Sequence, residues 1–394
     1  RGARARRGAR AGRGARVAGS GARVAEACAV VPRLVVEARS GAARTGTART
    51  SRGEFRFPCF MPVGTRGAVR ALDSVDLEAL GAEVVLANTY HLMLRPGYDV
   101  VAALGGLHRF TGLSCHILTD SGGFQVHSLD PVVDDDGVTF RSVYDGRVVR
   151  LTPEEAVAIQ EQLGADIQMV LDVCTGLPAP EEVLALAVER TAQWAARARA
   201  SHRRTDDQSL FGIVQGGVDP TLRVDSARRT VDLEFDGYGI GGLSVGESRE
   251  ELLGALEVTI PELPDDRLRY LMGVGDPIGV VEAVRRGVDL FDCVAPTRAA
   301  RHGTAWTSNG KLSLRASANR TDDRPIDESC GCSTCSKWSR GYLRHLLVVG
   351  EPTALRLVTI HNVAFMFDLV GRVRDAVAAS KLDGLGEALA QAWS

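Results

Sequence analysis

Short apolar runs alternate along this chain with longer stretches that have helix start signals. Eight runs have the length and the apolar content of buried strands, at residues 56–61, 83–87, 116–119, 168–171, 210–214, 238–240, 269–271 and 289–291. Between them, Thr152–Glu155 form a capping box with proline at the first helical position, and Pro180 and Asp276 precede two further helices. This alternation predicts an α/β fold, a (β/α)8 TIM barrel, with an open doubly wound sheet as the alternative.

Polar residues and glycines follow most of the predicted strands. The chemistry of a barrel lies at the C-terminal ends of its strands, which meet on one rim. The residues at these ends are Asn88, Asp120, Asp172, Gln215, Gly241, Gly242, Leu243, Met272, Gly273 and Asp292. Each alone would be an ordinary turn residue. Together, three carboxylates and two amides on one rim predict an active site.

The stretch around Asp292 contains several candidate functional residues close together. Asp292 stands where the last predicted strand leaves the sheet, and Arg298, Arg301 and His302 follow within ten residues. A carboxylate at a strand exit is a candidate nucleophile or base, and closely spaced arginines suit a polyanion. The alternative is a solvated loop after an edge strand.

Three cysteines form a candidate metal site. Cys330, Cys332 and Cys335 lie on a polar loop, and the fourth ligand is His361 or His345. We favour His361, which begins a helical segment that the metal would fix to the loop. Three thiolates and one imidazole predict a closed, structural Zn²⁺ site.

Composition and charge narrow the class of protein. The net charge is −2, but eight arginines and no acid lie in residues 1–25, so the rest of the chain is more acidic. Residues 1–34 are expected to be a disordered Arg/Ala/Gly-rich extension, with residues 35–394 forming the functional part. The eight cysteines do not suggest a secreted disulfide framework, which predicts a cytoplasmic protein. No apolar run approaches the roughly 18 residues of a membrane span.

Taken in order, several motifs resemble the bacterial tRNA-guanine transglycosylases (the queuine tRNA-ribosyltransferase family). They are NTYHL at 88–92, TDSGGFQV at 119–126, GIVQGG at 212–217, GGLSVGE at 241–247, YLMGVG at 270–275, FDCVAPTRAARHG at 291–303, and the cysteine set ending at His361. The resemblance implies an irregular barrel with an inserted C-terminal zinc subdomain, at about residues 304–375, and a homodimer.

The implied reaction is base exchange in queuosine biosynthesis. The wobble guanine of tRNAs with GUN anticodons (Asn, Asp, His and Tyr) would be replaced by 7-aminomethyl-7-deazaguanine. By resemblance, Asp292 would be the nucleophile that forms a covalent tRNA intermediate, and Asp120 the general acid/base. The residues agree with this chemistry, since two displacements require paired carboxylates, as in retaining glycosidases.

The resemblance also assigns binding roles. Asp172, Gln215, Gly242 and Leu243 would read the guanine edge, Phe124 and Met272 would stack on the base, and Ser121 and Glu247 would support substrate binding. Arg298, Arg301 and His302 would contact the anticodon loop of tRNA. Cys174 and Val245 fit the bacterial pattern for the small aminomethyl base, whereas Val173 and His127 depart from the common pattern. For Phe124 and Met272, ordinary core packing is the alternative.

Other functions stay open from the sequence. A non-catalytic tRNA-binding subunit of the same family would keep the barrel and the zinc site, although the presence of both Asp120 and Asp292 argues against it. An archaeal-type enzyme would require further RNA-binding domains after the zinc helix. A barrel enzyme acting on a small phosphorylated molecule would leave the cysteine cluster unexplained.

Overall fold

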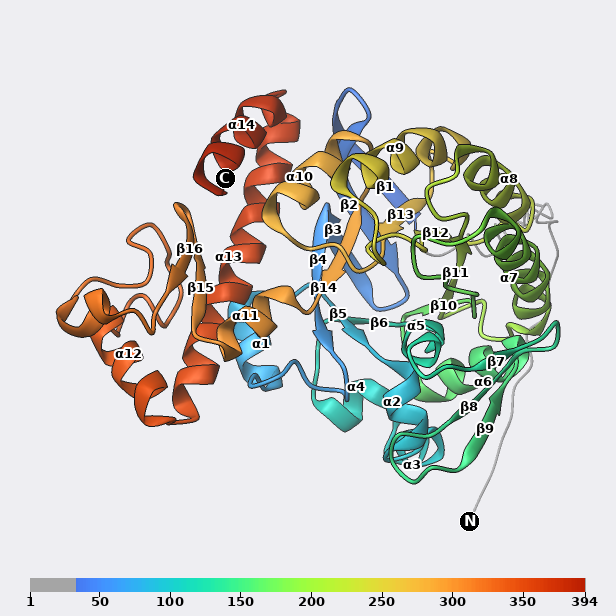
Figure 1. The fold of residues 1–394 in the computed structure, drawn as a ribbon, viewed down its shortest axis with the longest axis horizontal. Helices are drawn as coiled ribbons and strands as arrows, with labels where there is room; N and C mark the ends of the chain where they lie inside the picture. Colours follow the sequence, from blue (N-terminus) through green and yellow to red (C-terminus); the bar gives the residue numbers. More distant parts are fainter. Residues whose placement is uncertain (1–32, 394) are drawn as a thin grey trace, which may run out of the picture.

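The computed structural model describes residues 33–393, which form a closed barrel of eight parallel strands with flanking helices (Figure 1). The predicted barrel is therefore confirmed. Around the barrel the strands run β10-β11-β12-β13-β14-β4-β5-β6. Their bounds are β4 Cys59–Gly64, β5 Val84–Ala87, β6 His116–Thr119, β10 Ile167–Met169, β11 Ser209–Val214, β12 Gly237–Ile240, β13 Leu268–Leu271 and β14 Leu290–Cys293.

Helices surround the strands and bury an apolar face against them. Figure 1 shows α7, α8, α9 and α10 on the outside of the barrel. Their start signals act as predicted: Thr152 caps α6 in a capping box, and Asp276 caps α10. The helices of this part are α1 Ser74–Leu80, α2 Thr89–Leu94, α3 Tyr98–Ala103, α4 Gly106–Thr111, α5 Gly123–His127, α6 Pro153–Leu163, α7 Glu181–Ser201, α8 Pro220–Val231, α9 Arg249–Thr259, the 3₁₀ turn η1 Ile260–Glu262, α10 Pro277–Arg285 and α11 Ala295–Arg301.

The predicted bounds of the first and last barrel strands were wrong. Residues 56–61 are divided between β3 (Gly53–Phe57), in another sheet, and β4. Pro58 separates them, because proline has no N–H to continue a ladder of hydrogen bonds. At the other end, β14 begins after Asp289 and includes Asp292, which pairs with Met61 of β4.

Two small antiparallel sheets that the sequence did not predict flank the barrel. One contains β1 (Arg33–Ser40), β2 (Ala43–Thr50) and β3, and the other β7 (Val132–Val133), β8 (Val138–Arg141) and β9 (Val148–Leu151). The first sheet covers the N-terminal end of the barrel. Arg44 of β2 forms a buried ion pair with Asp289 at 2.6 Å, and Thr50 bonds His116 at the start of β6. The C-terminal end is left for the active site.

A C-terminal subdomain packs beside the barrel. It contains β15 (Thr304–Thr307), β16 (Gly310–Ser313), the 3₁₀ turn η2 (Ser317–Thr321), α12 (Arg340–Val349), α13 (Thr353–Ala378) and α14 (Leu382–Trp393). Helix α13 is long and apolar enough to cross a membrane by length and composition, but 67% of its most apolar window is buried inside the protein, as in a core helix. The extension predicted for residues 1–34 lies outside the described residues, except that β1 begins at Arg33.

Candidate functional site

A cavity of about 460 Å³ opens at the C-terminal end of the barrel. Its volume lies within the usual range for small-molecule sites. Nine of the ten residues predicted at the strand ends line it, and so do Ser121 and Phe124; the nine are Asn88, Asp120, Asp172, Gly241, Gly242, Leu243, Met272, Gly273 and Asp292. Arg298 also lines it, and Gln215 contacts it through Asp172. The rim predicted from the strand ends is therefore a physical cavity.

Asp120 is buried and saturated with hydrogen-bond donors. One carboxylate oxygen accepts from the backbone N–H groups of Thr89 (2.9 Å) and Gly122 (3.1 Å). The other accepts from the side-chain amides of Asn88 and Gln125. Burial raises the pKa of Asp120 to about 6, and the charge of Asp292 acts in the same direction, although the donors act against it. A carboxyl group with this pKa can both donate and accept a proton near neutral pH.

Within residues 33–393, the hydrogen bonds that hold Asp292 all reach one of its two oxygens. The Oδ1 atom accepts from the Tyr270 hydroxyl at 2.6 Å and from the Gly273 N–H at 2.7 Å. Burial raises the pKa of Asp292, while these two donors lower it. Because both donors bind Oδ1, Oδ2 is available toward the cavity. This arrangement orients a carboxylate without occupying the oxygen that would react.

Asp172 and Gln215 form a buried polar pair at the base of the cavity. The Gln215 side-chain amide donates to Asp172 at 2.6 Å, and the Ser121 hydroxyl donates to the other oxygen of Asp172 at 3.4 Å. Burial raises the pKa of Asp172 to about 6. Gly242 has φ +64°, and a Cβ atom there would lie 2.2 Å from the Gln215 side-chain oxygen. Glycine therefore lets the backbone approach this pair closely.

The walls of the cavity are apolar. Phe124 is 57% exposed and Met272 is half-buried, so the core-packing alternative does not hold for Phe124. Cys174 and Val245 also line the cavity. Glu247 accepts hydrogen bonds from the N–H groups of Ser244 and Val245, which fixes the turn after Leu243.

The cationic residues of the rim lie on α11. Arg298 is exposed and lines the cavity, and Arg301 follows one turn later. Partial burial lowers the pKa of Arg301, and the charges of Arg70 and Arg298 lower it further. His302 is exposed at the end of the helix and does not line the cavity.

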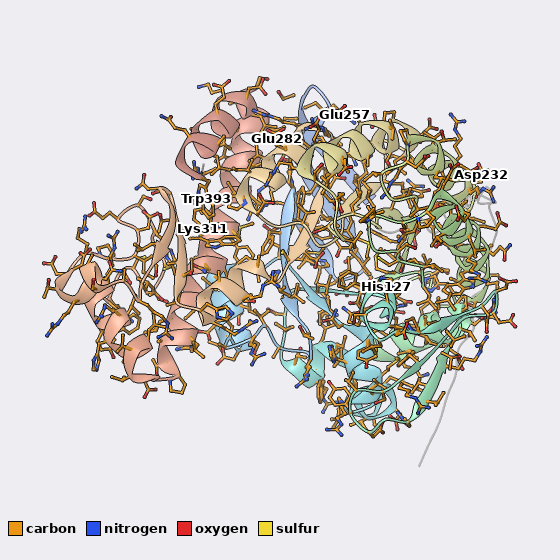
Figure 2. All side chains as sticks on the ribbon, viewed as in Figure 1. His127, Asp232, Glu257, Glu282, Lys311 and Trp393 are labelled. Atoms are coloured by element: carbon orange, nitrogen blue, oxygen red, sulfur yellow. The ribbon has the colours of Figure 1, made fainter. Side chains whose placement is uncertain are left out.

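Two residues that depart from the family pattern lie close together. His127 and Val173 line one small cavity of about 20 Å³ beside Asp172. The sequence also offers Lys311 as a phosphate contact, with a lone solvated lysine as the alternative, and the structure places it on β16. Figure 2 shows it next to Trp393, on the side of the molecule that carries α14, away from the centre of the barrel.

The predicted metal ligands come together in the C-terminal subdomain. Ligand atoms of Cys330, Cys332, Cys335 and His361 all lie within 4.8 Å of one another, and His361 is completely buried. The Nε2–H of His361 donates to the Trp306 carbonyl at 2.7 Å, which leaves Nδ1 directed at the thiols. This orientation is typical of metal-binding histidines. His345 is exposed on α12 and is not part of the group.

Asn362 connects this cluster to the active-site rim. Its side-chain oxygen accepts from the Trp306 N–H at 2.9 Å. Its amide nitrogen donates to the carbonyls of Pro296 (2.9 Å), in α11, and Thr304 (3.0 Å), in β15. The residue next to His361 therefore fixes the helix that carries Arg298.

Reasoning from sequence missed the residues that hold the two aspartates. Tyr270 and Gln125 enter the sequence interpretation only as members of the motifs YLMGVG and TDSGGFQV, with no role of their own. A signal existed for Tyr270, because residues two apart on a strand face the same side, and Met272 was already assigned to the rim. Nothing comparable marked Gln125, which reaches Asp120 from helix α5.

The sequence of this chain is similar to those of known proteins over most of its length. The sequence model described as "Queuine tRNA-ribosyltransferase" matches residues 39–394. A queuine tRNA-ribosyltransferase from Symbiobacterium thermophilum is 50% identical over 356 residues, covering 90% of this chain and 89% of that protein. Those from Moorella thermoacetica and Bacillus licheniformis are 51% and 48% identical, each covering 88% of this chain and 93% and 91% of their own lengths.

Proposed function

Because the chain belongs to the queuine tRNA-ribosyltransferase family, whose members exchange guanine in tRNA, we propose that Asp292 and Asp120 carry out this exchange by double displacement. The observation that supports this assignment is the different bonding of the two carboxylates that face one cavity. Among the described residues, Asp292 has one oxygen without a donor, whereas burial raises the pKa of Asp120 to about 6 although four donors hold it in place. The first suits a nucleophile and the second a proton carrier.

In the first displacement, Oδ2 of Asp292 attacks the ribose anomeric carbon. The bond from that carbon to guanine breaks, its electron pair passes to the base, and the base takes a proton from Asp120. In the second displacement, the incoming base gives its ring proton to Asp120, and its nitrogen attacks the same carbon, which releases Asp292. Two inversions give net retention, as in retaining glycosidases.

Base recognition is proposed for the residues around Asp172. The target guanine must leave its stack, so the pocket must hold a flat base and read its edge. Asp172, Gln215 and the backbone at Gly242 and Leu243 offer acceptors and donors for that edge, supported by Ser121 and Glu247. Phe124 and Met272 offer apolar surfaces for the two faces. Cys174 and Val245 line the cavity and fit the bacterial pattern for a small aminomethyl base, which supports 7-aminomethyl-7-deazaguanine as the incoming base.

The RNA partner is proposed to be a tRNA of the GUN-anticodon group. Arg298, Arg301 and His302 follow the nucleophile on α11 and would contact the anticodon loop beside the target nucleotide. A tRNA substrate also supports action in the cytoplasm. The homodimer expected from the family resemblance is carried as part of the proposal.

We assign the Cys330, Cys332, Cys335 and His361 cluster to Zn²⁺. Three thiolates and one imidazole are the donor set of structural zinc sites, and the tautomer of His361 fits a ligand through Nδ1. The metal would supply folding energy, because all four protein donors close the coordination sphere. The active-site carboxylates belong to the barrel and need no contact with it.

A denaturing gel of the protein with a GUN-anticodon tRNA tests the catalytic assignment. A tRNA-linked band is expected for the wild type and not for Asp292→Asn, and free guanine should release it. A matched control is Asp206→Asn, which changes an exposed carboxylate. A band that persists in Asp292→Asn would exclude this nucleophile. Binding of tRNA with neither band nor exchange would instead indicate the non-catalytic subunit.

A further inference from the structure

Two arginines gather around one tyrosine at the rim of the barrel. Tyr144 lies in the loop between β8 and β9, and the guanidinium carbons of Arg95 and Arg66 lie 4.5 Å and 5.5 Å from its ring centroid. Arg95 also donates to the Tyr144 carbonyl at 3.2 Å. Such cation–π contacts restrict where a guanidinium can point. With His91, these residues form what we call the Tyr144 cluster.

The Tyr144 cluster adjoins the active-site cavity. The Tyr144 hydroxyl lies 2.9 Å from Nδ1 of His91, and His91 lines the cavity together with Asp120 and Asp292. Thr65, next to Arg66 in the chain, lines it too. The cluster is therefore one side chain away from the position of the target nucleotide.

Neither guanidinium group forms an ion pair within the part of the chain that the structure describes. Within residues 33–393, no carboxylate lies within 4.0 Å of Arg66 or Arg95, although most arginines of the barrel exterior are paired. Asp145, next to Tyr144 in the chain, pairs with Arg147 at 3.5 Å, and the charge of Arg95 acts on Asp145 only from beyond ion-pair distance, where it helps to lower the pKa of that carboxyl. Both guanidiniums are on exposed residues and keep unused N–H donors.

These charges continue the cationic rim that begins on α11. Arg298 and Arg301 follow β14, Arg66 and Arg70 follow β4, and Arg95 follows the short helix after β5. Strands β14, β4 and β5 are neighbours in the barrel, and Arg70 is close enough to Arg301 to lower its pKa. The result is an arc of cations along one side of the cavity.

We propose that Arg66 and Arg95, positioned by Tyr144, bind phosphodiester groups of the tRNA strand that enters the cavity. The proposal rests on the proposed function, since it specifies a second RNA contact of the same site. A phosphate fits because a guanidinium donates two parallel hydrogen bonds to it, and because an unpaired cation gains most from a polyanion. Tyr144 is a positioning residue, since its ring orients the two groups.

The salt dependence of tRNA binding tests the phosphate contacts. Each contact with a single strand contributes about 0.7 to the slope of log affinity against log salt concentration. The double variant Arg66→Gln/Arg95→Gln should therefore bind an unmodified GUN-anticodon transcript more weakly, with the slope reduced by about 1.4. Arg228→Gln, on the barrel exterior where Arg228 pairs with Glu262, is the matched loss of one charge and should keep the wild-type slope.

Tyr144→Leu tests the positioning role. It removes the ring but neither charge, so affinity for the transcript should fall about twofold to fivefold while the salt slope and the KM for guanine stay unchanged. Tyr144→Phe keeps the ring and should bind tRNA like the wild type.

Three outcomes would overturn the proposal that Arg66 and Arg95, positioned by Tyr144, bind phosphate groups. They are a wild-type slope in the double arginine variant, wild-type tRNA affinity in Tyr144→Leu, or a Tyr144→Leu defect confined to the KM for guanine. Each leaves the covalent band of the wild type unaffected, so this failure is distinct from failure of the catalytic proposal. If the wild type itself does not bind the transcript, the proposed function fails first.

Discussion

The cavity at the C-terminal end of the barrel and the cysteine cluster both bury groups that water would normally solvate, but they do so in opposite ways. In the cysteine cluster, four ligand atoms lie within 4.8 Å of one another, so they can satisfy one another through one ion. In the cavity, Asp120, Asp172 and Asp292 all have raised pKa values and face a space of about 460 Å³.

Because of this difference, we expect the cysteine cluster to determine stability and the cavity to determine function. A closed cluster contributes its binding energy to the folded state. An open cavity keeps carboxylates poorly solvated until a substrate arrives, which lowers stability but leaves reactive atoms accessible. Changes in the first region should therefore affect folding, and changes in the second should affect catalysis or even stabilise the fold.

The largest effect is expected in the cluster. Cys332→Ser should lose the metal and at least about 4 kcal/mol of the free energy of unfolding, because loss of a metal is among the most destabilising changes. Metal content and chemical denaturation measure this. His345→Ala, which changes an exposed histidine outside the cluster, should keep both values. Full metal content in Cys332→Ser would show that this thiol is not a ligand.

In the cavity, the opposite sign is expected for Asp172→Asn. A carboxyl group whose pKa is raised from 3.8 to about 6 binds protons more tightly when folded, so wild-type stability falls as pH rises through that interval. Asp172→Asn has no titratable group at this position, so its stability lacks this dependence on pH. Its stability relative to the wild type should rise by up to about 3 kcal/mol between pH 4 and pH 7, while base exchange is lost.

Denaturation at both pH values measures the effect, with Asp206→Asn as the control for an exposed carboxylate. A relative stability of Asp172→Asn that is independent of pH would contradict the burial argument. If the stability of Asp172→Asn relative to the wild type fell with rising pH, the carboxyl group would have the opposite effect on stability from the one proposed.

The smallest effect is expected from Tyr270→Phe. Its hydroxyl lowers the pKa of Asp292, so its loss should raise that pKa further and move the acid limb of the pH–rate profile to higher pH. A hydrogen bond to a charged group contributes about 1.5–3 kcal/mol, which predicts a roughly 10- to 100-fold lower kcat. Tyr238→Phe, a buried tyrosine on the neighbouring strand, is the control. An unchanged profile would mean that Tyr270 does not hold the reacting carboxylate.

The barrel could be predicted because its strands are short and mostly apolar, and because polar residues or glycines lie at the ends of most of them. The cysteine cluster could be predicted because its three cysteines are close together in the sequence. The sheet of β1, β2 and β3 could not. Strand β2 reads ARTGTART, which has too few apolar residues to indicate a strand.

The stability of that sheet depends on partners far away in the chain. Arg44 is buried because Asp289, 245 residues later, neutralises it through two hydrogen bonds. The same holds at the active site, where Asp120 could be located from its strand but its donors come from α5 and from the end of β5. Local sequence patterns predict helices and strands. Ion pairs and hydrogen bonds between residues far apart in the chain depend on the completed fold.

Asn362 sets a requirement for anyone who redesigns the C-terminal subdomain. A single side chain there accepts one hydrogen bond and donates two, to backbone groups in α11 and around β15. Among short side chains only asparagine offers this combination, since aspartate lacks the donors and serine has only one. A subdomain transplanted from another protein would therefore need asparagine at this position to keep the helix that carries Arg298 in register with the barrel.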